Sequence, residues 1–147
     1  QYAGTIEEGL GAAVAARIVK RELPTFVGPA FEEVCRQWLM RQVVESELDV
    51  LPKAIGSWWG TNPNTRRQEE IDVVLEDADG ELIVGECKWR YEPVDTDVLE
   101  TLERRSALLG RPIKQYYLFS KSGFTKACQN RAAQTSNARL VGLEQLL

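Results

Sequence analysis

Within the acidic stretch of residues 68–89, two carboxylates and the one ammonium group are spaced so that they could act together. Asp72 is near the start of a first apolar run, and Glu86 and Lys88 are two residues apart near the end of a second. Because side chains alternate along a strand, Glu86 and Lys88 are expected to share a face. Hard divalent cations prefer oxygen ligands, so these residues could hold a metal ion. The alternative is an ion pair on a sheet edge, between Lys88 and either carboxylate.

The register of the predicted hairpin decides whether Asp72 joins that face. If residues 78–80 form a three-residue loop that ends in a left-handed glycine, Asp72 lies opposite Glu86. A tight turn at residues 79–80 would place Asp72 opposite Cys87, on the other face. We favour the longer loop, which brings all three charged groups to one end of a sheet.

Apolar residues occupy both faces of this hairpin. The face of the charged residues is expected to carry Val74, Leu82 and Val84, and the other face Ile71, Val73, Leu75, Ile83 and Cys87. A strand pair that is apolar on both faces is typical of the centre of a sheet covered on both sides. Charged residues are rarely buried there without a partner, so we favour a functional site over a surface ion pair.

The composition limits the chemistry. The chain has 147 residues, 44% hydrophobic and 27% charged, enough for one domain without a membrane-spanning run. Its three cysteines are widely spaced in apolar patterns, which indicates reduced core thiols and a cytoplasmic protein. Histidine is absent. Acid–base or metal chemistry must therefore rest on carboxylates, lysine or water.

Charge is distributed unevenly along the chain. The net charge is −4, but residues 1–87 hold 8 Lys and Arg against 16 Asp and Glu, whereas residues 88–139 hold 10 against 5. A protein with an acidic total can still present a basic face to phosphates. The Trp58–Trp59 pair could stack on bases, but we favour core and rim positions for it. Arg66–Arg67 are expected in a solvated loop, with phosphate contact as the alternative.

The predicted elements give an α/β fold with a mixed central sheet flanked by helices. Before the hairpin they are a capped helix from Thr5 to Arg21, a break at residues 23–28, a helix that starts at Gly28–Pro29 and a strand at 55–59. After the hairpin they are a helix from Asp95 to about Leu109 and a strand at 113–119. A helix after Ser122 or Gly123, a strand at 139–141 and a final turn at 143–147 complete the chain. The core stripe of the second helix is expected to be Phe31, Val34, Cys35, Trp38 and Leu39.

The pattern Asp72…Glu86-Cys87-Lys88 resembles the PD-(D/E)xK nuclease superfamily, although Ile71 replaces the proline of the motif. The resemblance implies a restriction-endonuclease-like αβββαβ core, here with an extra N-terminal helix. It also gives Glu32 a role, since an acid on the first core helix often approaches the metal in that superfamily. The alternative for Glu32 is a helix-dipole charge in the first turn.

Three segments together resemble a narrower family: LPTFVGPAFEEVCRQWL (23–39), IGSWWG (55–60) and EIDVVLEDADGELIVGECKW (70–89). This family is the nuclease-like domain of unknown function that follows the ATPase module in prokaryotic, mainly archaeal, AAA+-type ATPases. The resemblance implies that residues 1–27 are a helix and linker from an upstream ATPase, and that residues 28–147 are the nuclease-like domain. Glu32, Asp72, Glu86 and Lys88 then occupy its motif positions.

Our leading hypothesis is a metal-dependent nuclease domain that acts on DNA. Asp72 and Glu86 would hold Mg²⁺ or Mn²⁺ with the Cys87 carbonyl, Lys88 would offset charge on the phosphate, and Glu32 would support the site. The predicted DNA contacts are Arg90, Arg104, Arg105, Lys114, Lys121, Lys126 and Arg131. The alternative for these is a solvated surface balanced by nearby acids. The rival function is an inactive nuclease-fold module for DNA binding or protein docking. A homo-oligomer is left open.

Overall fold

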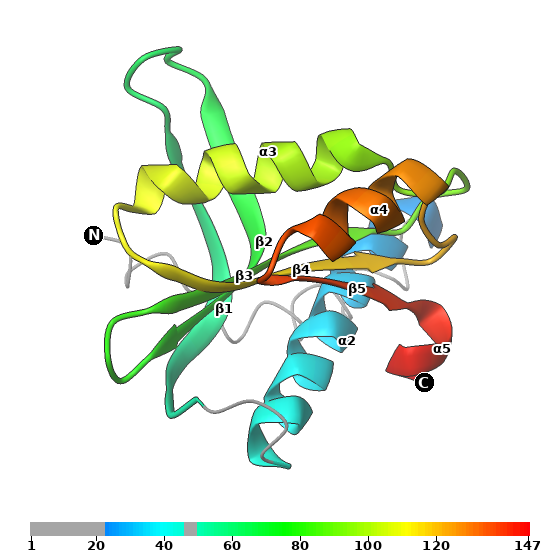
Figure 1. The fold of residues 1–147 in the computed structure, drawn as a ribbon, viewed down its shortest axis with the longest axis horizontal. Coiled ribbons are helices and arrows are strands. Elements are labelled where there is room, and N and C mark those ends of the chain that lie inside the picture. The colour runs from blue at the N-terminus through cyan, green and yellow to red at the C-terminus, as the bar shows by residue number, and fades with distance from the viewer. Residues whose placement is uncertain (1–22, 46–49) are drawn as a thin grey trace.

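The computed structural model describes residues 23–45 and 50–147, so the predicted helix from Thr5 to Arg21 lies outside the described part. The elements are α2 (Leu23–Val44), β1 (Pro52–Thr61), β2 (Gln68–Asp77), β3 (Leu82–Lys88), α3 (Thr96–Ser106), the 3-10 helix η2 (Ala107–Leu109), β4 (Ile113–Ser120), α4 (Lys126–Gln134), β5 (Ala138–Gly142) and α5 (Leu143–Leu146) (Figure 1). This order contains the predicted αβββαβ succession. No helix in the described ranges has the length and apolar character of a membrane span.

The five strands form one mixed sheet in the order β1-β2-β3-β4-β5. The first three are antiparallel, and β3, β4 and β5 are parallel. Helices α2 and α5 cover one face, and α3 and α4 cover the other (Figure 1). The predicted α/β fold with a mixed central sheet flanked by helices is confirmed.

Helix α2 begins at Leu23, so the predicted break at residues 23–28 is wrong. Pro24 falls in the first turn, where backbone N–H groups have no partner within the helix. Proline lacks this N–H group, so no helical hydrogen bond is lost at this position. Pro29 lies inside the helix. The buried stripe is Phe31, Cys35 and Leu39, at a spacing of four residues. Val34, predicted to be buried, is 40% exposed.

The hairpin has the predicted register. Val74 pairs with Val84 and Val73 with Gly85, as the longer loop requires. The paired ladder ends at Val73, and beyond it the Cys87 amide donates to the Asp72 carboxylate. Gly80 adopts the left-handed conformation, at a φ of 87°. The three-residue loop is therefore confirmed, and the tight turn is excluded.

A β-bulge in β2 contradicts one predicted face. Gly56 pairs with Val74 and Trp58 pairs with Ile71, so β2 contributes one more residue than β1 between these pairs. The extra residue reverses the alternation. Ile71 consequently packs with Val74 in the core beneath α3, whereas it was expected on the opposite face. The faces predicted for the other apolar residues of the hairpin are confirmed.

The ends of several other elements also follow the sequence. Asp95 caps α3 by accepting a hydrogen bond from the Thr96 amide. Helix α4 starts later than predicted, at Lys126, because the Thr125 hydroxyl is its N-cap. Trp58 packs against the core and Trp59 is 52% exposed, so the core-and-rim prediction is confirmed.

Gly85 is required by close packing behind the site. A Cβ at this position would lie 3.0 Å from Phe119 Cε2 and 3.3 Å from Val73 Cβ, both fully buried residues. We expect Gly85→Ala to lower the free energy of unfolding by about 1–3 kcal/mol, as overpacking does, in a urea titration. Gly28→Ala is the control, because a Cβ there meets no atom within 4 Å; within a helix it should stabilise. Equal stability of the two variants would contradict this account.

Candidate active site

The charged residues of the hairpin meet where the middle of β2 lies beside the end of β3. Lys88 Nζ lies 3.2 Å from Glu86 Oε2, so these two side chains form an ion pair. Asp72 Oδ2 accepts a hydrogen bond of 2.8 Å from the Cys87 backbone amide. The Asp72 carboxylate is therefore held against β3, close enough to Glu86 for the two charges to interact.

Glu86 has one unsatisfied oxygen. Its side chain is buried, and Oε1 has no hydrogen-bond partner among the described residues. A buried carboxylate oxygen without a donor is costly, and such atoms commonly mark a bound ion or a catalytic role. The second oxygen, Oε2, is occupied by Lys88.

The two carboxylates oppose each other's ionisation. Burial raises the pKa of Glu86 to about 7, with a further increase from the charge of Asp72 and a partial offset from Lys88. Burial also raises the pKa of Asp72, although the hydrogen bond from the Cys87 amide acts in the opposite direction. A cation at this position would relieve both effects.

Glu32 approaches the same carboxylates from α2. Burial, followed by the charge of Asp72, raises its pKa to about 8. The neighbouring Arg36 Nη1 donates a hydrogen bond of 3.0 Å to the Asp72 carbonyl, which ties α2 to β2. Because α2 begins at Leu23, Glu32 lies well beyond its first turn. The helix-dipole explanation for Glu32 is therefore wrong, since that effect is confined to the end turn.

Cys87 presents its side chain to the core and not to the site. Its thiol is buried in the cluster that contains Cys35 and Phe31, and burial raises its pKa well above the usual value. The thiol therefore packs in the core on the α2 side of the sheet. The backbone carbonyl is the group that Cys87 has to offer a metal ion.

A pocket of about 210 Å³ opens beside these residues, against α3. It is lined by Glu86, Lys88, Arg90, Asp97, Val98, Thr101 and Arg105. The Nε atom of Arg90 is buried and has no hydrogen-bond partner among the described residues. The pocket thus combines a buried carboxylate with three cationic groups, an arrangement that suits a phosphate beside a metal ion.

The predicted DNA contacts do not all reach this pocket. Arg90 and Arg105 line it, whereas Lys121 does not, because its ammonium group lies over the Trp89 ring at 4.9 Å from the centroid. Arg104 lies one residue away on α3. The other three, Lys114 on β4 and Lys126 and Arg131 on α4, do not line the pocket. Arg131 instead forms an ion pair of 2.7 Å with Glu103.

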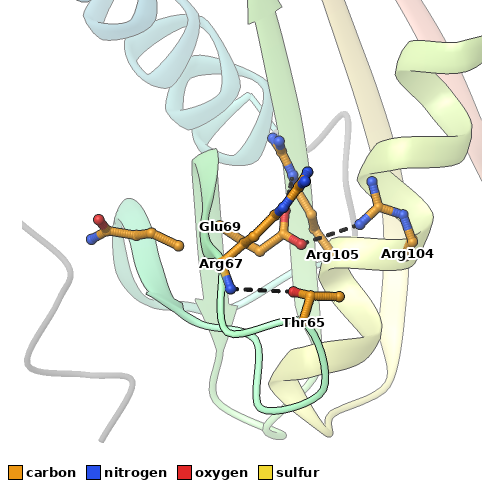
Figure 2. Close-up of a pocket in the computed structure, with 6 residues that line it drawn as sticks. Thr65, Arg67, Glu69, Arg104 and Arg105 are labelled. Carbon is orange, nitrogen blue, oxygen red and sulfur yellow. Dashed lines mark hydrogen bonds and ion pairs between the residues drawn. The ribbon is translucent and has the colours of Figure 1, made fainter.

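Glu69 is a buried charge that sequence reasoning did not single out. It accepts a hydrogen bond of 2.9 Å from Arg105 Nε and one of 3.2 Å from Arg104 Nη1 (Figure 2). Burial alone would raise its pKa, but the hydrogen bonds from Arg105 and Asn62 outweigh burial and hold the pKa below its usual value. No local pattern links Glu69 to an arginine pair 35 residues away, so only the packing of α3 on β2 shows it.

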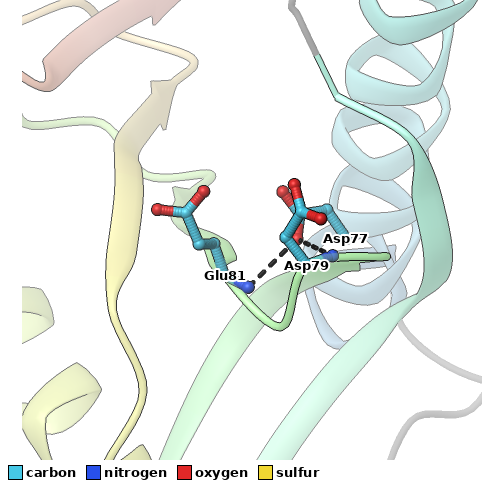
Figure 3. Close-up of side chains that lie close together, drawn as sticks. All are labelled: Asp77, Asp79 and Glu81. Carbon is cyan, nitrogen blue, oxygen red and sulfur yellow. Dashed lines mark hydrogen bonds between the residues drawn. The ribbon is translucent and has the colours of Figure 1, made fainter.

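A second acidic group lies at the opposite end of the hairpin. Asp77, Asp79 and Glu81 bring carboxylate oxygens within 4.8 Å of one another (Figure 3). Asp77 Oδ1 accepts hydrogen bonds from the Asp79 and Glu81 amides, so this carboxylate stabilises the turn. Among the described residues, no trio this close occurs at the candidate site. That site offers two opposed carboxylates, with Glu32 as a more distant third.

Comparison with known proteins gives one family and several similar structures. The model of the DUF234 family, described as archaeal and bacterial proteins of unknown function, matches residues 1–107. Among solved structures, a protein of unknown function, AF1548, is 25% identical with a TM-score of 0.48, over 78% of this chain and 65% of that one. A repair endonuclease from Pyrococcus abyssi is 18% identical with a TM-score of 0.44, over 74% and 46%.

The restriction endonuclease MspJI, in complex with a 27-mer oligonucleotide, is 14% identical with a TM-score of 0.48, over 94% of this chain and 30% of that one. The chain therefore spans less than two thirds of each of these structures. Among curated proteins, none matches the chain.

Proposed function

The chain belongs to the DUF234 family of archaeal and bacterial proteins of unknown function, and from this premise and the geometry of the site we propose that it is a metal-dependent phosphodiesterase domain that acts on DNA. The observation that carries the proposal is the buried Glu86 Oε1, which has no partner among the described residues, beside the half-buried Asp72 carboxylate whose charge acts on Glu86. Residues 1–27 would connect this domain to an upstream ATPase module of the same polypeptide.

The donor atoms at the site fit a hard divalent cation. Asp72 and Glu86 supply carboxylate oxygens and Cys87 a backbone carbonyl. Mg²⁺ is usually held by one or two carboxylates, together with waters and substrate phosphates, and Mn²⁺ accepts the same ligands. When bound, such an ion acidifies water and polarises a phosphate oxygen. The residues present therefore suit Mg²⁺ or Mn²⁺.

The remaining side chains would orient the phosphate and manage charge. Lys88, held 3.2 Å from Glu86 Oε2, would offset negative charge that develops on the phosphorus centre. The guanidinium groups of Arg90 and Arg105 line the same pocket and can bind phosphate oxygens. Glu32 would support the site from α2, where burial and the charge of Asp72 raise its pKa to about 8.

The second candidate function is a catalytically inactive nuclease-fold module that binds DNA or docks onto protein. The ion pair between Lys88 and Glu86 favours it, because Lys88 already offsets part of the charge that a metal ion would neutralise. The two functions make opposite predictions for metal binding.

Thermal melting with and without divalent cations separates the two functions. If Asp72 and Glu86 hold a metal ion, millimolar Mn²⁺ or Mg²⁺ should raise the melting temperature, because ligand at 100 times its Kd stabilises by about 2.7 kcal/mol. The same preparation should cleave DNA with Mn²⁺ and not with EDTA. A melting temperature that ignores Mn²⁺, together with intact single- and double-stranded DNA, would reject the nuclease for this chain and leave the binding module.

A further inference from the structure

A wide groove adjoins the site pocket on the α3 side of the sheet. Its volume is about 660 Å³, and its lining residues are Thr65, Arg67, Gln68, Glu69, Arg104 and Arg105 (Figure 2). They come from the loop between β1 and β2, from the start of β2 and from the end of α3. Arg105 lines both the groove and the site pocket, so the two are neighbours.

Glu69 fixes the arginines on the floor of the groove. Its two oxygens accept from Arg105 Nε at 2.9 Å and from Arg104 Nη1 at 3.2 Å. Arg105 Nη1 also donates to the Glu70 carbonyl at 3.1 Å. A guanidinium has five N–H donors, so these contacts orient both groups and leave donors that face outward. The Arg104 side chain is 58% exposed.

The β1–β2 loop is built to hold a fixed shape. Asn62 is buried, and its side-chain oxygen accepts hydrogen bonds from the amides of Asn64 at 2.9 Å and Thr65 at 3.4 Å. The Asn62 and Arg67 backbones are joined by a bond of 2.8 Å. Arg66 has a φ of 61°, a left-handed conformation that is unfavourable for a residue with a side chain. Such strain persists where the surroundings enforce it, and it gathers at functional sites.

Positive charge exceeds negative charge along this surface. Arg66 and Arg67 are exposed on the loop, and Arg104 and Arg105 face them from α3. Among the described residues that line the groove, Glu69 is the one acid, and it faces three lining arginines with Arg66 beside them. This excess contrasts with the net charge of −4 of the whole chain. Asp97 is the acid on the α3 side of the adjoining pocket.

We propose that this groove binds the phosphate backbone of the nucleic-acid strand that occupies the site. The span from Asp72 to Gln68 along β2 is four residues, or about 13 Å at 3.3 Å per residue. A groove at this distance would contact the phosphates that flank the reacting one, and phosphate contacts set the register of a bound strand. An open groove that continues from the phosphate pocket suits a polyanionic strand better than a small anion. The inference deepens the proposed function and rests on it for the position of the reacting phosphate.

The test measures the affinity of the full 147-residue chain for DNA in EDTA at a series of salt concentrations. Binding is detected by the fluorescence anisotropy of a labelled 20-mer, used once as a single strand and once as a duplex. The Arg66→Ala/Arg67→Ala double variant should bind about tenfold more weakly than the wild type at low salt. The slope of log K against log salt is negative, and each lost phosphate contact makes it less steep by about 0.9 in duplex DNA and about 0.7 in single strands. The magnitude of the slope should therefore decrease by about 1.4 to 1.8 in the double variant, which loses two contacts. Arg104→Ala, which also removes an exposed arginine, should decrease the magnitude by about half as much.

The control is Arg41→Ala/Arg139→Ala, which removes two exposed arginines from α2 and β5, outside the groove lining. A wild type that does not bind either DNA, or a double variant with the affinity and slope of this control, overturns the groove inference. Either result leaves the Mn²⁺-linked melting rise and the cleavage assay to decide the proposed function separately. Conversely, groove-dependent binding without a metal-linked rise upholds the groove and rejects the nuclease. Comparing the two DNA forms shows which one the groove prefers.

Discussion

Asp72→Asn should abolish the metal-linked rise in melting temperature and lower metal-dependent DNA cleavage by about a hundredfold or more. The loss of a charged ligand removes several kcal/mol of charge stabilisation, and about 2.7 kcal/mol corresponds to a hundredfold in rate. The amide side chain has the same shape and retains an acceptor for the Cys87 amide, which now bonds Asp72 Oδ2. The strand end should therefore stay folded.

The same substitution should have the opposite effect without metal. Next to burial, the charge of Asp72 is the largest cause of the raised pKa of Glu86. Removing that charge therefore relieves the repulsion between the Asp72 and Glu86 carboxylates. In EDTA the variant should melt at or above the wild-type temperature. The control is Asp79→Asn, which changes an exposed acid of the hairpin-turn group and should retain the full Mn²⁺-linked rise. A rise that is lost in Asp79→Asn and kept in Asp72→Asn would place the metal ion at the turn instead.

The metal-free chain should lose stability as the pH rises from about 4.5 to about 8. Glu86 and Glu32 have folded-state pKa values of about 7 and about 8, against 4.5 as the ordinary value. In this window the folded state binds more protons than the unfolded state, so the free energy of unfolding falls with pH. For the buried Glu86 alone, a difference of this size corresponds to the order of 3 kcal/mol. Urea titrations between pH 5 and pH 8.5 in EDTA measure it.

Glu86→Gln should flatten this pH dependence and should exceed the wild type in stability at pH 8, because it removes the ionisation that burial opposes. Glu100→Gln, an exposed change of the same kind on α3, should keep the wild-type profile. Saturating Mn²⁺ should reverse the wild-type trend, since metal binding requires ionised carboxylates. A metal-free chain whose stability is constant or rises between pH 5 and pH 8 would show that Glu86 is ionised throughout.

The local sequence determined the hairpin and the residues that meet at its end. A three-residue loop with Gly80 in the left-handed conformation sets the pairing between β2 and β3. The period of two along a strand then places Glu86 and Lys88 together and turns Cys87 into the core. Turn geometry and strand alternation act over a few residues, so the sequence contains all the information that these features need.

Only the tertiary structure decided which distant groups complete this site. The bulge opposite β1 moved Ile71 to the other face, and the early start of α2 removed the helix-dipole explanation for Glu32. The pairing of Glu69 with Arg104 and Arg105 depends on how α3 packs on β2. The raised pKa of Glu86 likewise depends on the layers that bury it. Burial and long-range charge contacts arise only when separate elements pack, so periodicity and spacing along the chain do not encode them locally.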